Sequence, residues 1–96
     1  TICAGNDLLA IGALLGAQET GHHVPDEVSI VGIDDIYPAQ TTSPPLTTVA
    51  KPKYDIGIEA ARFLLARIKG EAPQSARKLQ LAGHLQVRAS TRKLCN

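Results

Sequence analysis

The sequence contains little of several residue types that build or staple small proteins. It has no methionine and no tryptophan, its aromatic content is only 3%, and its two cysteines, Cys3 and Cys95, lie near opposite ends. Cysteines so placed match neither a zinc-binding spacing nor a Cys-x-x-Cys redox pair. We expect Cys3 to be a small core residue and Cys95 a free thiol, a usage that fits a reducing cytoplasm. The core itself must be built from Leu, Ile, Val and Ala.

Charge excess and long apolar runs are also missing. The formal net charge is +1, and no basic cluster interleaved with aromatic residues marks a nucleic-acid surface. Arg88, Arg92 and Lys93 fit a solvated C-terminal tail. No apolar stretch approaches the roughly 20 residues that cross a bilayer, so no membrane contact is expected. The chain opens at Thr1 without a basic start or an initiator methionine, which we interpret as the mark of a processed or excised piece.

The first third of the chain predicts a β-α-β unit. Residues 1–4 form a short apolar run, and a helix over residues 7–20 follows, with Asn6 or Asp7 as its N-cap. Residues 28–33 are rich in β-branched residues and apolar on both faces, which is typical of a buried parallel strand. Strand, helix and strand in this order predict an α/β fold with a parallel sheet flanked by helices.

The rest of the chain predicts a loop over residues 34–46, a short strand over residues 46–49 and a second helix over residues 54–69. This helix carries an apolar stripe at helical spacing. The members of the stripe are Tyr54, Ile58, Ala61, Leu65 and Ile68. Alternating apolar residues over 78–87 predict one or two strands interrupted at Gly83.

Polar side chains follow two of the predicted parallel strands. Asn6 lies just past the first strand, and Asp34 and Asp35 lie just past the second. Because parallel strands point their carboxyl ends the same way and ligands bind outside those ends, Asn6 and Asp34 should share one rim of the sheet. A carboxylate that accepts from adjacent hydroxyls, beside an amide that donates and accepts, suits a sugar or another polyhydroxylated ligand. The alternative is that Asn6 only caps the helix and the aspartates only form a turn.

No pattern in the sequence indicates an enzyme or a resident cofactor. His22 and His23 are adjacent in a predicted surface loop without a third metal ligand, so neither a metal nor an organic cofactor is expected. Asp34 and Asp35 lack a partner nucleophile, and adjacent residues on extended chain point opposite ways. An enzyme of Rossmann type would need a Gly-x-Gly-x-x-Gly loop, which the sequence lacks.

Four segments form a series that covers nearly the whole chain. They are AGNDLLAIGA at residues 4–13, VPDEVSIVGIDDI at residues 24–36, SPPLTTV at residues 43–49 and LQVRAST at residues 85–91. In this order they resemble the motifs A-N-D-x-x-A-x-G-A, V-P-x-D-V-S-V-V-G-F-D-D, P-P-L-T-T-V and L-x-x-R-x-S-T of the lactose-repressor (LacI/GalR) family of bacterial transcription regulators. Gly5 and Glu27 depart from the usual Ala and Asp.

The resemblance implies an incomplete core of the periplasmic-binding-protein-like fold, type I, in which two α/β lobes hold an effector between them. It places residues 1–49 in the C-terminal lobe and residues 50–52 in a crossover. Residues 53–83 then belong to the N-terminal lobe, and residues 84–96 form a strand and tail that return to the first lobe.

The motifs also carry the family's ligand contacts onto this chain. Asn6 and Asp34 match positions that touch a small-molecule effector, which would be a sugar or a sugar derivative. Lys51 stands where several members place a glutamine that also touches the ligand. A cation at that position either favours an anionic or phosphorylated ligand or points to solvent, and the sequence leaves both open.

The resemblance further implies a cytoplasmic homodimer, with Leu8, Ile11, Thr42 and Pro44 near the partner subunit. Operator DNA would be bound only by a helix-turn-helix head that lies N-terminal to these residues. The competing hypothesis is a fragment of a periplasmic sugar-binding transport protein, which shares the fold, although the P-P-L-T-T-V and R-x-S-T motifs favour the regulator. Because each lobe is incomplete, we expect that the chain is not a stable monomer.

Overall fold

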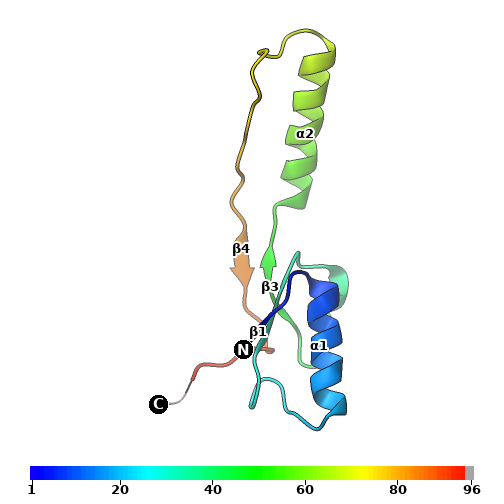
Figure 1. Ribbon diagram of the computed structural model, residues 1–96, viewed down its shortest axis with the longest axis vertical. Coiled ribbons are helices and arrows are strands. Elements are labelled where there is room, and N and C mark those ends of the chain that lie inside the picture. Colours follow the sequence, from blue (N-terminus) through cyan, green and yellow to red (C-terminus); the bar gives the residue numbers. More distant parts are fainter. Residues whose placement is uncertain (95–96) are drawn as a thin grey trace. The chain divides into compact units, whose positions relative to one another are not determined.

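The computed structural model describes residues 1–94, so the thiol predicted at Cys95 lies outside the described residues. Its elements, drawn in Figure 1, are β1 (Ile2–Cys3), α1 (Asp7–Glu19), β2 (Ile30–Ile33), the 3-10 helix η1 (Tyr37–Gln40), β3 (Thr47–Ala50), α2 (Lys53–Ile68) and β4 (His84–Gln86). They form two compact units. The sheet unit comprises Thr1–Lys51 and the segment from His84 onward, and the α2 unit comprises Pro52–Gly83.

The sheet unit contains the strands in the order β1-β2-β3-β4. β1 pairs with β2 and β2 pairs with β3 in parallel, whereas β4 runs antiparallel to β3. The predicted β-α-β unit is therefore confirmed, because α1 connects the parallel strands β1 and β2. The α/β fold class is also confirmed, as a mixed sheet whose one antiparallel strand comes from the chain that returns after α2.

Helix α1 is bounded by two residues whose types favour a helix start and a helix end, Asn6 and Gly21. Asn6 has extended backbone, and its Oδ1 accepts a hydrogen bond from the N–H of Leu9 at 2.9 Å, which satisfies one of the free donors at the helix start. The helix ends at Glu19, one residue before the predicted end. Gly21 follows with a φ of 84°, a left-handed conformation that glycine adopts without steric cost.

The core of the sheet unit lies where α1 packs against the sheet (Figure 1). Its fully buried members are Ala10, Leu14, Ile30, Ala39 and Leu46. Ala39 belongs to η1, in the segment that we predicted to be loop throughout, so that prediction was incomplete. Pro38 fits the first turn of a short helix, and the burial of Ala39 holds this turn against the rest of the core.

The returning tail is joined to the sheet unit through the buried residue Ser90. Its Oγ donates to the carbonyl of Ile30 at 2.6 Å and accepts from the N–H of Thr47 at 2.8 Å. Its own carbonyl accepts from the N–H of Ile30 at 2.9 Å. Because one hydroxyl both donates and accepts, Ser90 satisfies backbone groups of both β2 and β3.

The prediction that Cys3 is a core residue was wrong, because Cys3 is exposed. Cys3 lies in β1, whose two residues are both exposed. Among the described residues, β1 has a strand neighbour on one side only, β2. An apolar run predicts a strand, but how far that strand is buried depends on neighbours that the run itself does not encode.

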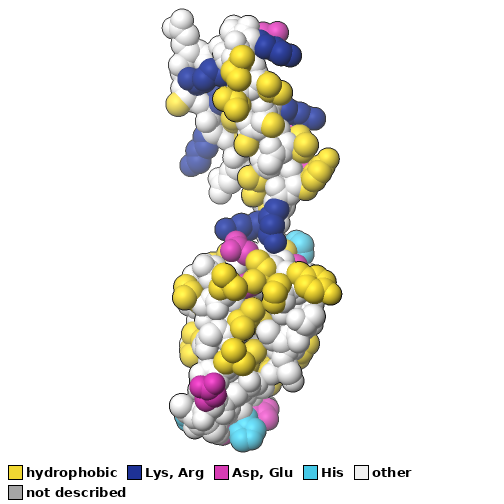
Figure 2. Space-filling view, turned by 90° about the vertical axis from the view of Figure 1, so that its right-hand side faces the viewer, with side chains coloured by type: hydrophobic (Ala, Val, Ile, Leu, Met, Phe, Trp, Pro, Cys, Tyr) yellow, Lys and Arg dark blue, Asp and Glu magenta, His cyan; other side chains and the backbone are white. Residues whose placement is uncertain are grey.

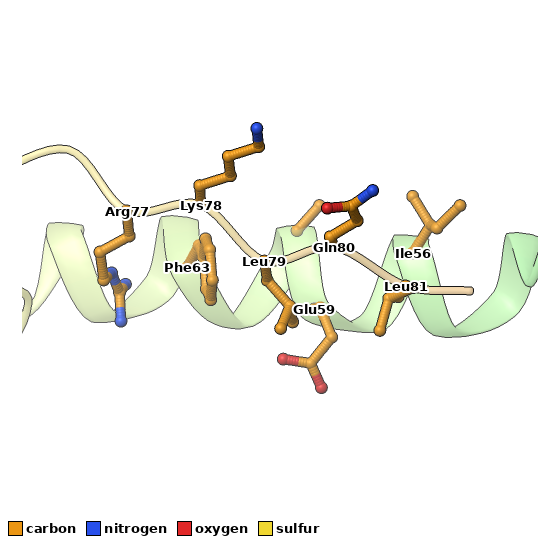
Figure 3. A pocket seen from close by; sticks show the side chains of 9 residues that line it. Ile56, Glu59, Phe63, Arg77, Lys78, Leu79, Gln80 and Leu81 are labelled. Atoms are coloured by element: carbon orange, nitrogen blue, oxygen red, sulfur yellow. The ribbon is translucent and has the colours of Figure 1, made fainter.

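The α2 unit consists of one helix and an extended segment beside it, and no residue of α2 is fully buried. Residues 77–81 and one side of the helix enclose a groove of about 510 Å³ (Figure 3). The helix residues that line it are Ile56, Glu59, Ala60 and Phe63. Residues 78–83 have no strand pairing, so only His84–Gln86 of the predicted 78–87 region forms a strand.

The apolar stripe that we predicted for α2 is not the side that lines this groove. Tyr54, Leu65 and Ile68, which belong to that stripe, are 80%, 52% and 71% exposed. The stripe at helical spacing predicted a helix correctly, but it did not predict which side of that helix this chain covers.

Among residues 1–94, no helix combines the length and the hydropathy that a bilayer crossing requires.

Candidate functional site

The three predicted ligand residues each follow one of the three parallel strands. Asn6 follows β1, Asp34 follows β2 and Lys51 follows β3. Since these strands run in the same direction, their carboxyl ends meet at one edge of the sheet. We call the set Asn6, Asp34 and Lys51 the C-terminal rim. The site that the sequence predicted at this edge therefore has its residues at neighbouring strand ends.

Lys51 and Asp34 form an ion pair at this rim. The Lys51 Nζ lies 2.8 Å from Asp34 Oδ1, and the two side chains are 50% and 33% exposed. The contact places the Lys51 ammonium beside the neighbouring carboxylate, and both alternatives for Lys51, an anionic ligand or an orientation to solvent, stay predictions. An ion pair this exposed contributes at most about 1 kcal/mol to stability. A ligand group can therefore replace one partner of the pair with little loss of free energy.

Asn6 is half-buried and caps helix α1 through its Oδ1, as described above. The interpretation of Asn6 as an N-cap is therefore correct for the amide oxygen. This cap does not use the amide nitrogen, which is the donor half of the side chain. Capping and ligand contact are thus compatible, because they need different atoms of the same amide.

The backbone at Asp34 and Asp35 has an uncommon conformation. Their φ angles are 119° and 55°, in the region that residues with a Cβ seldom adopt. Strained residues of this kind cluster at functional sites and persist only where the surroundings hold them. Here the N–H of Asp34 donates to the carbonyl of Val49 at 2.9 Å, which continues the contact between β2 and β3 past the strand end.

Asp35 pairs with Arg88 of the returning tail. Arg88 Nη2 lies 2.6 Å from Asp35 Oδ1, and Arg88 Nη1 donates to the carbonyl of Leu46 at 2.9 Å. The Arg88 side chain is only 14% exposed, so its assignment to a solvated tail was wrong. A guanidinium offers donors in a planar fork, which lets Arg88 bind a carboxylate and a carbonyl together. The R-x-S-T motif was the one signal in the sequence for this role.

A role for Asp7 in the site was not predicted from the sequence, where Asp7 was considered only as a residue of the helix start. It is fully buried. Its Oδ1 accepts from the hydroxyl of Thr48 at 2.6 Å, and its Oδ2 accepts from the N–H of Ile36 at 2.9 Å. A buried carboxylate is tolerated only when its oxygens are hydrogen-bonded, and these contacts meet that requirement. The position of Asp7 directly after Asn6 was the available signal.

The residues predicted near a dimer partner lie on α1 and on the loop that follows η1. Leu8 is 70% exposed, whereas Ile11 is half-buried and packs against the core. The hydroxyl of Thr42 donates to the carbonyl of Pro44 at 2.9 Å. Gln18 of α1 joins this loop by donating to the carbonyl of Ser43 at 2.7 Å. Figure 2 shows hydrophobic side chains gathered on one face of the sheet unit, which contains α1.

His22 and His23 both lie against Glu27 in the loop before β2. The His22 Nδ1 is 2.9 Å and the His23 Nδ1 is 3.5 Å from a carboxylate oxygen of Glu27. The hydrogen bond from His22, supported by the charges of the two histidines, lowers the pKa of the Glu27 carboxyl below its usual value of 4.5. Within residues 1–94, no group of three or more His, Cys, Asp or Glu side chains is arranged to hold a metal ion.

An open sheet with polar side chains at the carboxyl ends of adjacent parallel strands defines a class of α/β ligand-binding domain. Residues 1–91 match the model of the periplasmic binding protein-like domain, and the chain belongs to that family. It is 43% identical over 89 residues to the HTH-type transcriptional repressor CytR of Escherichia coli (strain K12). That match covers 93% of this chain and 26% of CytR, so the chain spans about a quarter of the length of this relative.

Solved structures agree with this assignment. A transcriptional regulator CelR–cellobiose complex matches with a TM-score of 0.87 and 41% identity, over 92% of this chain and 27% of that one. The lac repressor dimer bound to operator and an anti-inducer matches with a TM-score of 0.82 and 31% identity, over 93% of this chain and 30% of that one. The relatives are transcription repressors of the lactose-repressor type, so the resemblance carried by the four sequence motifs is confirmed.

Proposed function

We propose that this chain forms part of the effector-binding domain of a bacterial transcription repressor, and that Asn6, Asp34 and Lys51 contact its effector. The observation that carries the proposal is the C-terminal rim. Three parallel strands end side by side in an amide, a carboxylate and an ammonium group. The CelR relative, which shares the fold, was solved with cellobiose, and this supports a carbohydrate-like ligand.

The ion pair at the rim defines the chemistry of the proposed effector more narrowly. Asp34 uses Oδ1 for Lys51, so its second oxygen can accept from a ligand hydroxyl, while the Lys51 ammonium has further donors. A ligand that supplies a hydroxyl donor and an adjacent acceptor therefore fits both side chains at once. Sugars and sugar acids both have this pattern, and a sugar acid adds a negative charge that Lys51 would attract.

A second copy of the chain is proposed as the partner of α1. This helix is apolar on all sides, and Leu8, Leu9 and Leu15 are exposed on it. A helix apolar all round is usually buried all round. The relative solved as a dimer supports self-association through this region, with Leu8, Ile11, Thr42 and Pro44 as its proposed contacts.

The remaining roles belong to the proposed larger protein. The two compact units support the assignment of residues 1–49 and 84–96 to one lobe and residues 53–83 to the other. Operator DNA would be bound by a helix-turn-helix region, as expected of an HTH-type repressor such as CytR, rather than by residues of this nearly neutral chain. Such a repressor acts in the cytoplasm and needs no catalytic residue.

Calorimetry on the complete repressor tests the effector site. The probes are cellobiose, D-gluconate and its neutral counterpart D-glucitol. Asp34→Ala should weaken the binding of whichever probe binds by about 1–3 kcal/mol, because a charge-assisted acceptor is lost. Asp26→Ala removes an exposed carboxylate away from the rim and should leave the affinity unchanged. An unchanged affinity in Asp34→Ala, or no binding of any probe, would contradict the proposal.

A further inference from the structure

Buried hydrogen bonds hold the backbone of the proposed effector site, and the inference drawn from them rests on the proposed function. We propose that Asp7 and Thr48 are positioning residues, which hold the segment 34–36 so that the Asp34 carboxylate stays at the C-terminal rim. Neither side chain is accessible to a ligand, since both are fully buried. Their contribution is made through hydrogen bonds to the backbone that follows Asp34.

The three backbone N–H groups of this segment are each held by a different partner. The N–H of Asp34 donates to the carbonyl of Val49 at 2.9 Å, that of Asp35 to the hydroxyl of Thr48 at 3.3 Å, and that of Ile36 to Asp7 Oδ2 at 2.9 Å. The hydroxyl of Thr48 in turn donates to Asp7 Oδ1 at 2.6 Å. One buried threonine and one buried carboxylate thus hold two of the three donors.

The hydrogen-bonding capacity of both side chains matches this task. A hydroxyl has one proton and two lone pairs, so Thr48 can donate to Asp7 and accept from Asp35 at the same time. An ionised carboxylate only accepts, and each oxygen of Asp7 has one donor. Because the bond between Thr48 and Asp7 involves a charged acceptor, it is short and strong.

Strand β2 is shaped to admit the carboxylate. A Cβ placed on Gly32 would overlap Asp7 Oδ1 and would lie 3.1 Å from the Cβ of Ala10. The absence of a side chain at this one position of β2 therefore allows α1 to bring Asp7 against the sheet. Gly32 does not have a positive φ, so close approach is the reason for glycine at this position.

The hydrogen bonds of Asp7 and Thr48 join three segments of the site that lie far apart in the sequence. Asp7 directly follows Asn6 at the start of α1, Thr48 lies in β3, and the segment 34–36 follows β2. The carboxylate of Asp7 therefore fixes the strand end that carries Asn6 relative to the one that carries Asp34. The φ of 119° at Asp34 persists under this restraint, since a strained residue relaxes when its surroundings release it.

Amide hydrogen exchange on the complete protein separates this role from simple core packing. Thr48→Val keeps the shape of the side chain and removes its hydroxyl. Thr47→Val is the matched control, because Thr47 is the neighbouring buried threonine, and its hydroxyl bonds instead to the N–H of Arg88 and to Thr91. Thr48→Ser keeps the hydroxyl and is the rescue variant.

If the inference holds, Thr48→Val speeds exchange at the amides of Asp35 and Ile36 about tenfold relative to the β2 amides. The Asp35 amide loses its acceptor, and the Ile36 amide bonds to a carboxylate that Thr48 no longer holds. Thr47→Val should change both sets of amides alike, and Thr48→Ser should restore the slow exchange. Equal acceleration of the two sets in Thr48→Val would overturn the inference. Where that variant does not fold, faster exchange at Ile36 than at Asp34 in Asp7→Asn supports it, and equal exchange overturns it.

Titration of the same variants with whichever of cellobiose, D-gluconate and D-glucitol binds the wild type distinguishes this inference from the function on which it rests. Weaker binding in Thr48→Val than in Thr47→Val supports positioning of Asp34. Weak binding in Asp34→Ala together with unchanged binding in Thr48→Val would keep the proposed function and reject the positioning role. Binding that is unaffected by Asp34→Ala would reject the proposed function itself, while the exchange rates still report on the network.

Discussion

The sheet unit and the α2 unit differ in what stabilises them. In the sheet unit, α1, β2, η1 and Leu46, the residue before β3, bury a common apolar cluster. The same unit buries a connected set of polar groups. The α2 unit has no fully buried helix residue. Its side-chain contacts include an ion pair between Glu59 and Arg62 at the surface and the stacking of Arg77 over Phe63. A helix alone has several sides, and one extended segment covers only one of them.

The comparison indicates that a helix with defined ends does not by itself acquire a buried core. Both units contain a helix with a clear start and end, but only the helix that lies between two paired parallel strands acquires a core. A β-α-β connection brings segments that are distant in sequence onto the same helix side, whereas a helix followed by one extended segment does not. We therefore expect α2 to take much of its packing from protein beyond these residues.

Truncation of one leucine in each unit should give the largest contrast. Leu14 is 1% exposed and Leu65 is 52% exposed. Leu14→Ala should lower the free energy of unfolding by about 2–5 kcal/mol, whereas Leu65→Ala should change it by about 0.5 kcal/mol or less. Urea unfolding followed by circular dichroism measures both. Equal costs would mean that α2 is buried against another surface in solution.

Adding a methyl group to one glycine in each unit should give changes of opposite sign. A Cβ at Gly32 overlaps Asp7, while one at Gly57 in α2 meets open space. Gly32→Ala should cost about 1–3 kcal/mol through overpacking. Gly57→Ala should stabilise the protein by about 0.5–1 kcal/mol, because alanine loses less backbone entropy in a helix. Thermal melts of the two variants check the signs, and a stable Gly32→Ala protein would refute the close packing described for β2.

Self-association provides a third contrast between the units. Sedimentation of this chain at micromolar concentration should show a dimer or larger species rather than a single monomer. Leu8→Glu, on the exposed side of α1, should raise the dissociation constant about tenfold or more. Leu64→Glu on α2, where Leu64 is 60% exposed, serves as the matched control and should have less effect. A single, cooperatively folding monomer would show that these residues bury a self-sufficient core.

The smallest effect is expected from pH, at the exposed loop of the sheet unit. The pKa of Glu27 is lowered in the folded chain, chiefly by the hydrogen bond from His22. Its contribution to stability is therefore present above the usual pKa of 4.5 and is lost as the pH falls through the lower folded value. Unfolding curves from pH 6 to pH 3 should converge for the wild type and Glu27→Gln at the acidic end. A gap that widens on acidification would have the wrong sign for this mechanism.

Much of the sheet unit could be predicted from local patterns. Asn6 before an apolar helix predicted an N-cap, and Gly21 predicted the helix end, because both depend only on backbone geometry within a few residues. The loop prediction missed η1, since a short 3-10 turn around Pro38 has no periodic signal. Cys3 was misplaced because burial of a strand depends on its neighbours in the sheet.

The direction of the strands predicted which edge of the sheet carries the candidate site, but it did not predict the contacts within the site. Asn6 and Asp34 were placed on one rim because the order strand, helix, strand implies parallel strands. The pairing of Lys51 with Asp34 and the burial of Arg88 were not predicted. Arg88 lies 53 residues from Asp35 in the sequence, and no spacing rule connects positions so far apart.

The sequence by itself determined the β-α-β order, the limits of α1 and the family. Each of these follows from motifs or from contacts between residues that are close in the sequence. Only the tertiary structure decided that Asp7 is buried, that Thr48 bridges it to Asp35, and that Gly32 makes room for Asp7. The bond between Thr48 and Asp7 joins residues 41 apart. A carboxylate at a helix start has the same sequence pattern whether it faces solvent or the sheet, and its partners exist only after the parallel strands have paired.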